Sequence, residues 1–238
     1  MPFTFSHAAI VLPFLKNKRV SATGLLIGTF APDLEFFFRM RMQSEISHKL
    51  PGVFLIDLPL SILVVLLFHQ IIKKPLLTNL PLFFQQRLET LKHSDWLSYF
   101  NKNKTTVFFS FFVGVFTHLI WDSMTHWDGY LVLRSTFLNQ KISHVACYDI
   151  LQYLSSLIGL FCISLYFIQQ TKVPVATVQI SSFYWYGIVL ISSVCIVLRF
   201  VLVTNRNTIG DILVGVISSV FISMTVMGIV FNSRLKDN

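Results

Sequence analysis

Charged residues are scarce in this chain. Lys, Arg, Asp and Glu supply 13% of its 238 residues, about half the share that is usual for soluble domains. Hydrophobic residues supply 54%, and the mean hydropathy is +0.66. This composition excludes an ordinary soluble domain and indicates an integral membrane protein.

Acidic residues are the rarer of the two charge types, with 11 Asp and Glu against 19 Lys and Arg. A basic surface on an apolar chain suits anionic lipid headgroups. The sequence has no arginine-rich stretch and no alternation of aromatic and basic residues. We therefore expect membrane lipids, and not nucleic acid, as partners. No feature of the sequence predicts an oligomeric state.

Several motifs with known chemistry are missing. The three cysteines show no C-x-x-C spacing, and we interpret them as small core residues. The N-terminus lacks the charged region and the cleavage site of a signal peptide. The motifs G-x-S-x-G, G-x-G-x-x-G, H-E-x-x-H and the P-loop do not occur. Spaced charge pairs and inverted halves, which are typical of secondary transporters, are also missing.

Apolar segments of about 20 residues are long enough to span a membrane as helices. We predict an all-α polytopic bundle of five such helices in one integral membrane domain, residues 1–238, in which a segment 1–52 precedes the bundle 53–231. The long polar segment Lys73–Lys104 is expected to be mostly solvated, with an interfacial helix at Leu80–Leu91. The five predicted spans are Val53–Ile72, Thr105–Trp121, Tyr148–Ile168, Phe183–Val203 and Gly210–Phe231.

The segment before the first span carries its own local signals. Ser6 can cap a helix that runs to about Leu15, followed by a basic turn at Lys16–Arg19. The stretch Thr23–Phe38 is predicted to be a short helix or a re-entrant element. Pro32 interrupts it, because proline removes a hydrogen-bond donor and disfavours helix at the preceding residue.

A helical spacing of polar residues ends the second predicted span. His118, Asp122 and His126 follow one another at intervals of four, which places them on one face of a helix continuing through His126. Imidazole and carboxylate groups suit Zn²⁺ and related divalent ions. Polar residues of this kind inside a membrane generally mark a functional site. The alternative is a helix end at which polar side chains simply meet water.

Other candidate ligands lie in the N-terminal segment. Asp33 and Glu35 follow the helix break, where they can bind metal or act as a base, or can be solvated loop residues. His7 and His48 are weak candidates alone. The count of spans places all four on the same side of the membrane as His118. Together these residues predict a site with one to three divalent ions.

Further residues on this side have open roles. Asp57, one turn inside the first span, either orients a histidine ligand or forms a packing hydrogen bond. His144 is a less favoured ligand. His69 is placed at the far side, and His93 in a solvated loop. The same count assigns nine Lys and Arg to each side, so the positive-inside rule predicts no orientation.

Several motifs occur in an order that is similar to a membrane protein family, the bacterial domain of unknown function 4184. The order covers essentially the whole chain. A position that is often His in the family is Tyr153 here. The motifs are Met1–His7, Ala31–Glu35, Ser47-His48 with Pro51-Gly52, Asp57–Pro59, Lys74–Leu76, Thr117-His118 with Asp122 and Thr125-His126, and Leu151-Gln152.

The chain also resembles, more distantly, membrane-bound metal-dependent hydrolases and zinc-dependent phospholipase C. This resemblance implies zinc bound by His118 and Asp122, with Asp33 and His7 as further ligands. It implies hydrolysis of a phosphoester or lipid-like substrate in a bacterial cytoplasmic membrane, with Asp33 or Glu35 as the base. The other hypotheses are a non-enzymatic scaffold with a structural metal or polar cluster, and a transporter.

Overall fold

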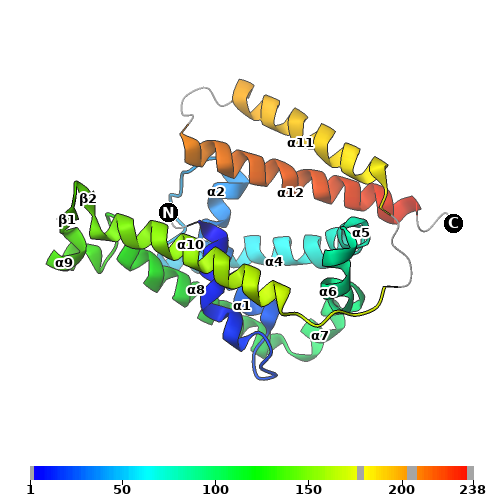
Figure 1. Ribbon diagram of the computed structural model, residues 1–238, viewed down its shortest axis with the longest axis horizontal. Coiled ribbons are helices and arrows are strands. Elements are labelled where there is room, and N and C mark those ends of the chain that lie inside the picture. Colours follow the sequence, from blue (N-terminus) through cyan, green and yellow to red (C-terminus); the bar gives the residue numbers. More distant parts are fainter. Residues whose placement is uncertain (1–2, 176–179, 203–207, 235–238) are drawn as a thin grey trace. The chain divides into compact units, whose positions relative to one another are not determined.

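The computed structural model describes residues 3–175, 180–202 and 208–234 (Figure 1). Its elements are almost all helices, which confirms the predicted all-α fold. Five helices are long and apolar enough to span a membrane: Val53–Asn79, Lys104–Thr125, Cys147–Ile168, Ser182–Leu202 and Ile209–Ser233. All five coincide with predicted spans. Val203, the predicted end of the fourth span, lies outside the described residues.

The chain folds into two compact units, each built from three separate segments. Unit 1 comprises residues 1–33, 46–61 and 100–169, and unit 2 comprises residues 34–45, 62–99 and 170–238. The first span, Val53–Asn79, contributes to both units. A single domain over residues 1–238 stays a prediction.

In unit 1, helix α8 (Lys104–Thr125) packs closely against the short helix α1 (Ala22–Phe30). Glycines make this approach possible: a Cβ atom at Gly28 would lie 2.2 Å from the carbonyl oxygen of Phe111. A Cβ atom at Gly114 would lie 2.4 Å from the carbonyl oxygen of Leu25. Because the clashes are with backbone atoms, side-chain rearrangement cannot relieve them. The two glycines thereby set α1 directly beside α8.

The N-terminal segment forms a helical hairpin within unit 1. Its first arm, η1 (Thr4–Phe14), is an 11-residue 3₁₀ helix, and α1 is the returning arm. At the start of η1, the backbone N–H of Phe3 donates to Ser156 Oγ at 3.0 Å, whereas Lys16 lies over the ring of Tyr166 at 5.8 Å. Ten residues of helix α10 (Cys147–Ile168), about 15 Å, separate these two contacts.

This hairpin corrects two predictions. The predicted cap at Ser6 is wrong, since the helix begins at Thr4 without a side-chain cap, whereas the predicted helix to about Leu15 is present in 3₁₀ form. Residues 1–52 are not all at the site end, since the basic turn lies at the opposite end of α10. The physical reason is the rise of a 3₁₀ helix, about 2 Å per residue, which lets eleven residues extend about 22 Å.

The first span contains two π-helical turns. It consists of η3 (Val53–Asp57), α4 (Leu58–Leu67), η4 (Phe68–Ile72) and α5 (Lys73–Asn79), after the single turn α3 (Leu50–Gly52). The polar segment Lys73–Lys104 is mostly helical, because α5, α6 (Leu82–His93) and α7 (Trp96–Lys102) occupy it. Buried Lys73 donates from Nζ to the carbonyl oxygen of Ser94. The predicted interfacial helix corresponds to α6.

The remaining elements are short or belong to unit 2. In unit 2, α11 (Ser182–Leu202) and α12 (Ile209–Arg234) pack through Tyr184, Ile188 and Met227. The short elements are η2 (Ala31–Asp33), α2 (Leu34–Arg39), η5 (Val132–Arg134), α9 (Thr136–Asn139), and the antiparallel strands β1 (Lys141–Ile142) and β2 (Val145–Ala146).

Candidate metal centre

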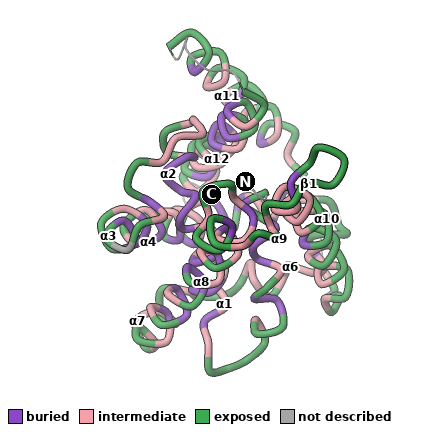
Figure 2. Tube along the Cα trace, turned by 90° about the vertical axis from the view of Figure 1, so that its left-hand side faces the viewer, coloured by how far each residue is buried: buried purple, intermediate pink, exposed green. Residues whose placement is uncertain are grey.

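Four side chains of unit 1 converge on one point. Asp33 ends η2, His48 lies in the loop before the first span, and His118 and Asp122 lie one turn apart on α8. One potential ligand atom from each residue lies within 4.8 Å of those of the other three. Figure 2 shows how strongly α8 is buried compared with α10, and both aspartates and His118 are buried.

The separations suit a single coordinated ion. His118 Nε2 lies 3.0 Å from Asp122 Oδ2 and 3.8 Å from Asp33 Oδ1. His48 Nε2 lies 3.6 Å from each of the same two oxygens. Bonds of about 2.0–2.1 Å to a tetrahedral zinc ion would place neighbouring ligand atoms about 3.3 Å apart. The four histidine–carboxylate distances are therefore within about half an ångström of the spacing in a four-coordinate zinc site.

The carboxylate of Asp33 is held from one side only. Thr4 donates its hydroxyl to Asp33 Oδ2 at 2.5 Å. Asp33 Oδ1, the oxygen that faces the two histidines, has no hydrogen-bond partner among the described residues although it is fully buried. An unsatisfied buried carboxylate oxygen is costly, and a cation is the partner that this geometry accommodates.

The orientation of His118 is set by α1. Its Nδ1 lies 2.8 Å from the carbonyl oxygen of Thr29, an acceptor, so Nδ1 carries the proton. Nε2 is then the nitrogen with a lone pair, and it faces the two carboxylates. Metal-binding histidines commonly donate their other ring nitrogen to such an acceptor. The close packing of α1 on α8 therefore also selects the tautomer of His118.

The loop that carries His48 is tightly constrained. Ser47 donates its hydroxyl to Asp57 Oδ1 at 2.8 Å. A Cβ atom at Gly52 would lie 2.0 Å from the carbonyl oxygen of Ile46, so only glycine fits there. His48 itself has a φ of 68°, a strained conformation for a non-glycine residue that is frequent at functional sites. Asp57 thus forms a hydrogen bond to a serine, the alternative to the predicted orienting role, and this bond holds the residue beside His48.

Asp122 presents its two oxygens to different partners. Oδ2 faces His118 and His48, as described above. Oδ1 lies 3.4 Å from His7 Nε2 and 3.5 Å from His126 Nδ1, and it has no hydrogen-bond partner within the described ranges. The ring of His7 also stacks on that of His118, with centroids 4.0 Å apart. Asp122 is therefore placed to bridge two groups of ligands.

The protonation states outside the membrane spans differ strongly. Burial disfavours a charge on His48, but the carboxylates of Asp122 and Asp33 prevail and raise its pKa to about 10. Burial, together with the neighbouring His118, lowers the pKa of His7 to about 4. Burial opposes the ionisation of Asp33, yet His118 and His48 lower the pKa of this carboxyl group. Burial also lowers the pKa of His126.

Other candidate residues have different surroundings. The carboxylate of Glu35 accepts from Arg39 Nε at 2.9 Å and from Ser44 Oγ at 3.0 Å, and it is not one of the four converging residues. His144 is exposed in the turn between β1 and β2. His69 stacks on Trp96, and His93 pairs with Glu89. These contacts are structural in kind.

Sequence reasoning did not find the residues that orient the candidate ligands. Thr4, Thr29 and Ser47 contact Asp33, His118 and Asp57 respectively. Thr4 lies three residues before His7 and Ser47 directly precedes His48, but nothing in their spacing predicts a partner 29 or 10 residues away. Tyr153, where the resemblance implies a histidine, is largely exposed.

The fold and this cluster define a polytopic helical membrane protein with a candidate metal site at one end of a spanning helix. The chain belongs to the family described as Domain of unknown function (DUF4184), whose model matches residues 1–229. This result confirms the predicted family. No curated protein and no solved structure matches the chain.

Proposed function

We propose that this protein is a membrane-embedded hydrolase that uses a divalent metal ion, zinc in the simplest case, on a phosphoester or lipid-like substrate. A bacterial cytoplasmic membrane is the location that goes with this proposal. The observation that carries it is the convergence of Asp33, His48, His118 and Asp122 at spacings of 3.0–3.8 Å. Two imidazole nitrogens and two carboxylate oxygens form a donor set typical of zinc.

The chain's own groups suit hydrolysis. A bound divalent ion would supply Lewis acidity, polarising a phosphoryl oxygen and lowering the pKa of a water molecule. Thr4 and Thr29 orient Asp33 and His118 from behind, which leaves their free atoms directed at one point. Asp33 Oδ1 faces the two histidines as a proposed metal ligand, whereas Asp122 Oδ1, buried and without a hydrogen bond in the described part of the cluster, is the available proton acceptor when one ion is bound. Glu35 is engaged by Arg39, so its predicted role as a base has less support.

A non-enzymatic scaffold is the second candidate, and one observation favours it. Protonated His48 can neutralise one of the two carboxylates that it faces, so the cluster holds together as an ion-pair network. Buried networks of this kind can exist without a metal ion. Metal content separates the two candidates directly.

The first experiment measures metal in the purified protein by inductively coupled plasma mass spectrometry. We expect at least one divalent ion per chain, and loss of that ion from His118→Ala and from Asp122→Asn. The control is His144→Ala, which removes an exposed histidine and should retain the ion. Wild-type protein that stays metal-free after equilibration with zinc would leave the scaffold as the better description.

The second experiment tests a second ion. Asp122 Oδ1, His7 Nε2 and His126 form the second group of donors that we propose. His126 Nδ1 also lies 3.2 Å from the carbonyl oxygen of Asp122 and would have to leave this acceptor to bind an ion. A content of two ions that falls to one in His126→Ala supports it, whereas an unchanged content refutes it. Hydrolysis of bis(p-nitrophenyl) phosphate by the wild type, lost in Asp33→Asn, tests the catalytic part of the proposal. Metal-loaded protein inactive on this ester and on phospholipids would contradict it.

A further inference from the structure

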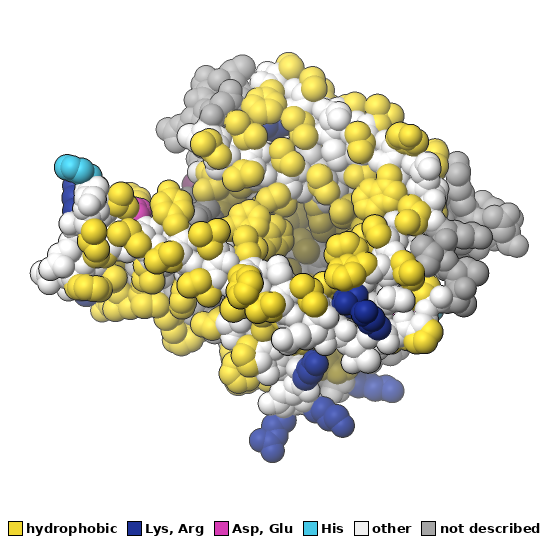
Figure 3. Space-filling model, viewed as in Figure 1, with side chains coloured by type: hydrophobic (Ala, Val, Ile, Leu, Met, Phe, Trp, Pro, Cys, Tyr) yellow, Lys and Arg dark blue, Asp and Glu magenta, His cyan; other side chains and the backbone are white. Residues whose placement is uncertain are grey.

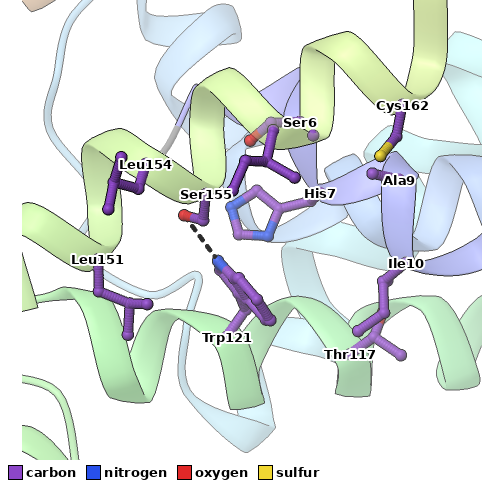
Figure 4. Close-up of a pocket in the computed structure, with 12 residues that line it drawn as sticks. Ser6, His7, Ala9, Ile10, Thr117, Trp121, Leu151, Leu154, Ser155 and Cys162 are labelled. Atoms are coloured by element: carbon purple, nitrogen blue, oxygen red, sulfur yellow. Dashed lines mark hydrogen bonds between the residues drawn. The ribbon is translucent and has the colours of Figure 1, made fainter. Parts of the chain in front are cut away.

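A cavity of about 420 Å³ lies in unit 1 between η1, α8 and α10. This volume falls in the range of about 300–1,000 Å³ typical of small-molecule sites. Figure 4 shows His7 at its centre, with Trp121 and Thr117 on α8 and Leu151, Leu154, Ser155 and Cys162 on α10. The remaining lining residues are Ser6, Ala9, Ile10, Ile158 and Gly159.

Three polar side chains in the wall are already bonded to the protein. Trp121 Nε1 donates to Ser155 Oγ at 3.2 Å, the dashed line in Figure 4. Ser155 Oγ donates in turn to the carbonyl oxygen of Gln152, and Thr117 Oγ1 donates to that of Gly114. The donors of these three side chains are thereby used within the wall. A molecule in this cavity would therefore be bound mainly through apolar contacts.

The cavity lies at the surface that would face lipid. Helix α10 is the least buried of the five candidate spans, and its outward side chains are mostly large and hydrophobic, as Figure 3 shows for this face. From Leu151 to Cys162 the wall follows α10 for about 16 Å. This length is about half of the hydrocarbon thickness of a bilayer, which is the depth of one leaflet. A second cavity, of about 250 Å³, shares Leu151 and Leu154 and continues toward Phe137.

His7 connects this cavity to the candidate metal centre. Its ring lines the cavity, while its Nε2 lies 3.4 Å from Asp122 Oδ1. A molecule whose alkyl chain fills the cavity would have its polar end beside the carboxylate of Asp122. This carboxylate faces candidate histidine ligands through both of its oxygens. The volume of the cavity, its apolar lining and its length of about one leaflet all suit an alkyl chain.

We propose that the cavity binds one alkyl chain of a membrane lipid and so positions the lipid's headgroup at the metal centre. The headgroup part rests on the proposed function, whereas the binding of the chain does not. The substrate class is then membrane lipid. His7 lies between the apolar cavity and the metal centre.

The test uses hexadecyl phosphate and the full-length protein in detergent, with binding followed by native mass spectrometry. We expect one saturable molecule per chain, and at least tenfold weaker binding in Ala9→Trp and Ile158→Trp, which fill the cavity. Leu157→Trp is the matched control, because Leu157 is exposed on α10 and does not line the cavity. Equal weakening by Ile158→Trp and Leu157→Trp would mean only unspecific surface lipid and would overturn the proposal.

Further measurements separate binding of the chain from binding of the headgroup and from the hydrolase proposal. Inorganic phosphate should not displace hexadecyl phosphate; displacement would mean that the headgroup alone drives binding and would contradict a chain site. Protein stripped of metal with EDTA should still bind the chain, so that a failed hydrolase proposal leaves this inference standing. In a Cys147→Ser/Cys195→Ser variant, hexadecyl phosphate should slow alkylation of Cys162, a test that needs no tryptophan variant to fold.

Discussion

The hydroxyl of Thr4 offers a sharp test of the metal centre, because Thr4 itself is not a candidate ligand. It donates to Asp33 Oδ2 at 2.5 Å and so directs Oδ1 of the same carboxylate toward the cluster. Thr4→Val removes the donor and keeps the branched shape. Because the carboxylate can then rotate away from the ion, we expect a weaker metal site in an intact fold.

The expected size of this effect follows from the hydrogen bond. A hydrogen bond to a charged group contributes about 1.5–3 kcal/mol, and about 1.4 kcal/mol corresponds to a factor of ten. Thr4→Val should therefore weaken zinc binding about 10- to 100-fold, the range typical of residues that orient metal ligands. Competition against a chromophoric zinc chelator in detergent measures the dissociation constant.

Two controls separate orientation from general damage. Thr4→Ser retains a hydroxyl and should bind zinc nearly as tightly as the wild type. Thr117→Val removes a hydroxyl that bonds only to its own helix at Gly114, and should leave zinc binding unchanged. A Thr4→Val protein that binds zinc as tightly as the wild type, or more tightly, would refute the reasoning.

Three other predictions concern the same unit. Ser47→Ala should release the loop of His48 and weaken zinc binding about 10- to 100-fold in the same competition assay, and unchanged affinity would show that Asp57 does not act through Ser47. Gly28→Leu should lower the free energy of unfolding by about 3 kcal/mol, because its side chain meets backbone; thermal unfolding checks this against Gly215→Ala, where the neighbour is the flexible side chain of Arg199. Zinc affinity should rise about tenfold per pH unit between pH 7 and 9, because the pKa of His48 is raised to about 10 and its proton must leave before it binds metal; a flat profile in this range contradicts that assignment.

The sequence was sufficient where periodicity and length carry the information. The interval between His118 and Asp122 predicts a shared helix face, and the structure places both side chains on that face of α8. The five spans follow from apolar length alone, and all five are present.

The local elements of the N-terminal hairpin were predicted, but its packing against α8 and α10 could not be, for two physical reasons. Each arm is shorter than a spanning helix, so neither η1 nor α1 meets the length criterion. The 3₁₀ form of η1 depends on its packing against α10, since runs this long are uncommon in that conformation. Contacts such as Thr4 with Asp33 exist only because the hairpin brings its two ends together.

The basic turn at the tip of the hairpin bears on the orientation of the protein in the membrane. The turn occupies the lower edge of Figure 1, where basic side chains also gather in Figure 3. Lys16 lies over Tyr166, near the end of α10 remote from the metal centre, and Lys18 and Arg19 follow in the same turn. Within unit 1, these three residues lie at the same end as Lys102 and Lys104 near the start of α8, whereas Lys49, Arg134 and Lys141 lie at the end of the metal centre.

Positive charge accumulates on the cytoplasmic side of membrane proteins. Applied to unit 1, this rule predicts that the metal centre faces away from the cytoplasm. Zinc supply and substrate would then come from the outer leaflet and the space beyond it. A short 3₁₀ helix at the N-terminus would in this way determine from which compartment the site is reached.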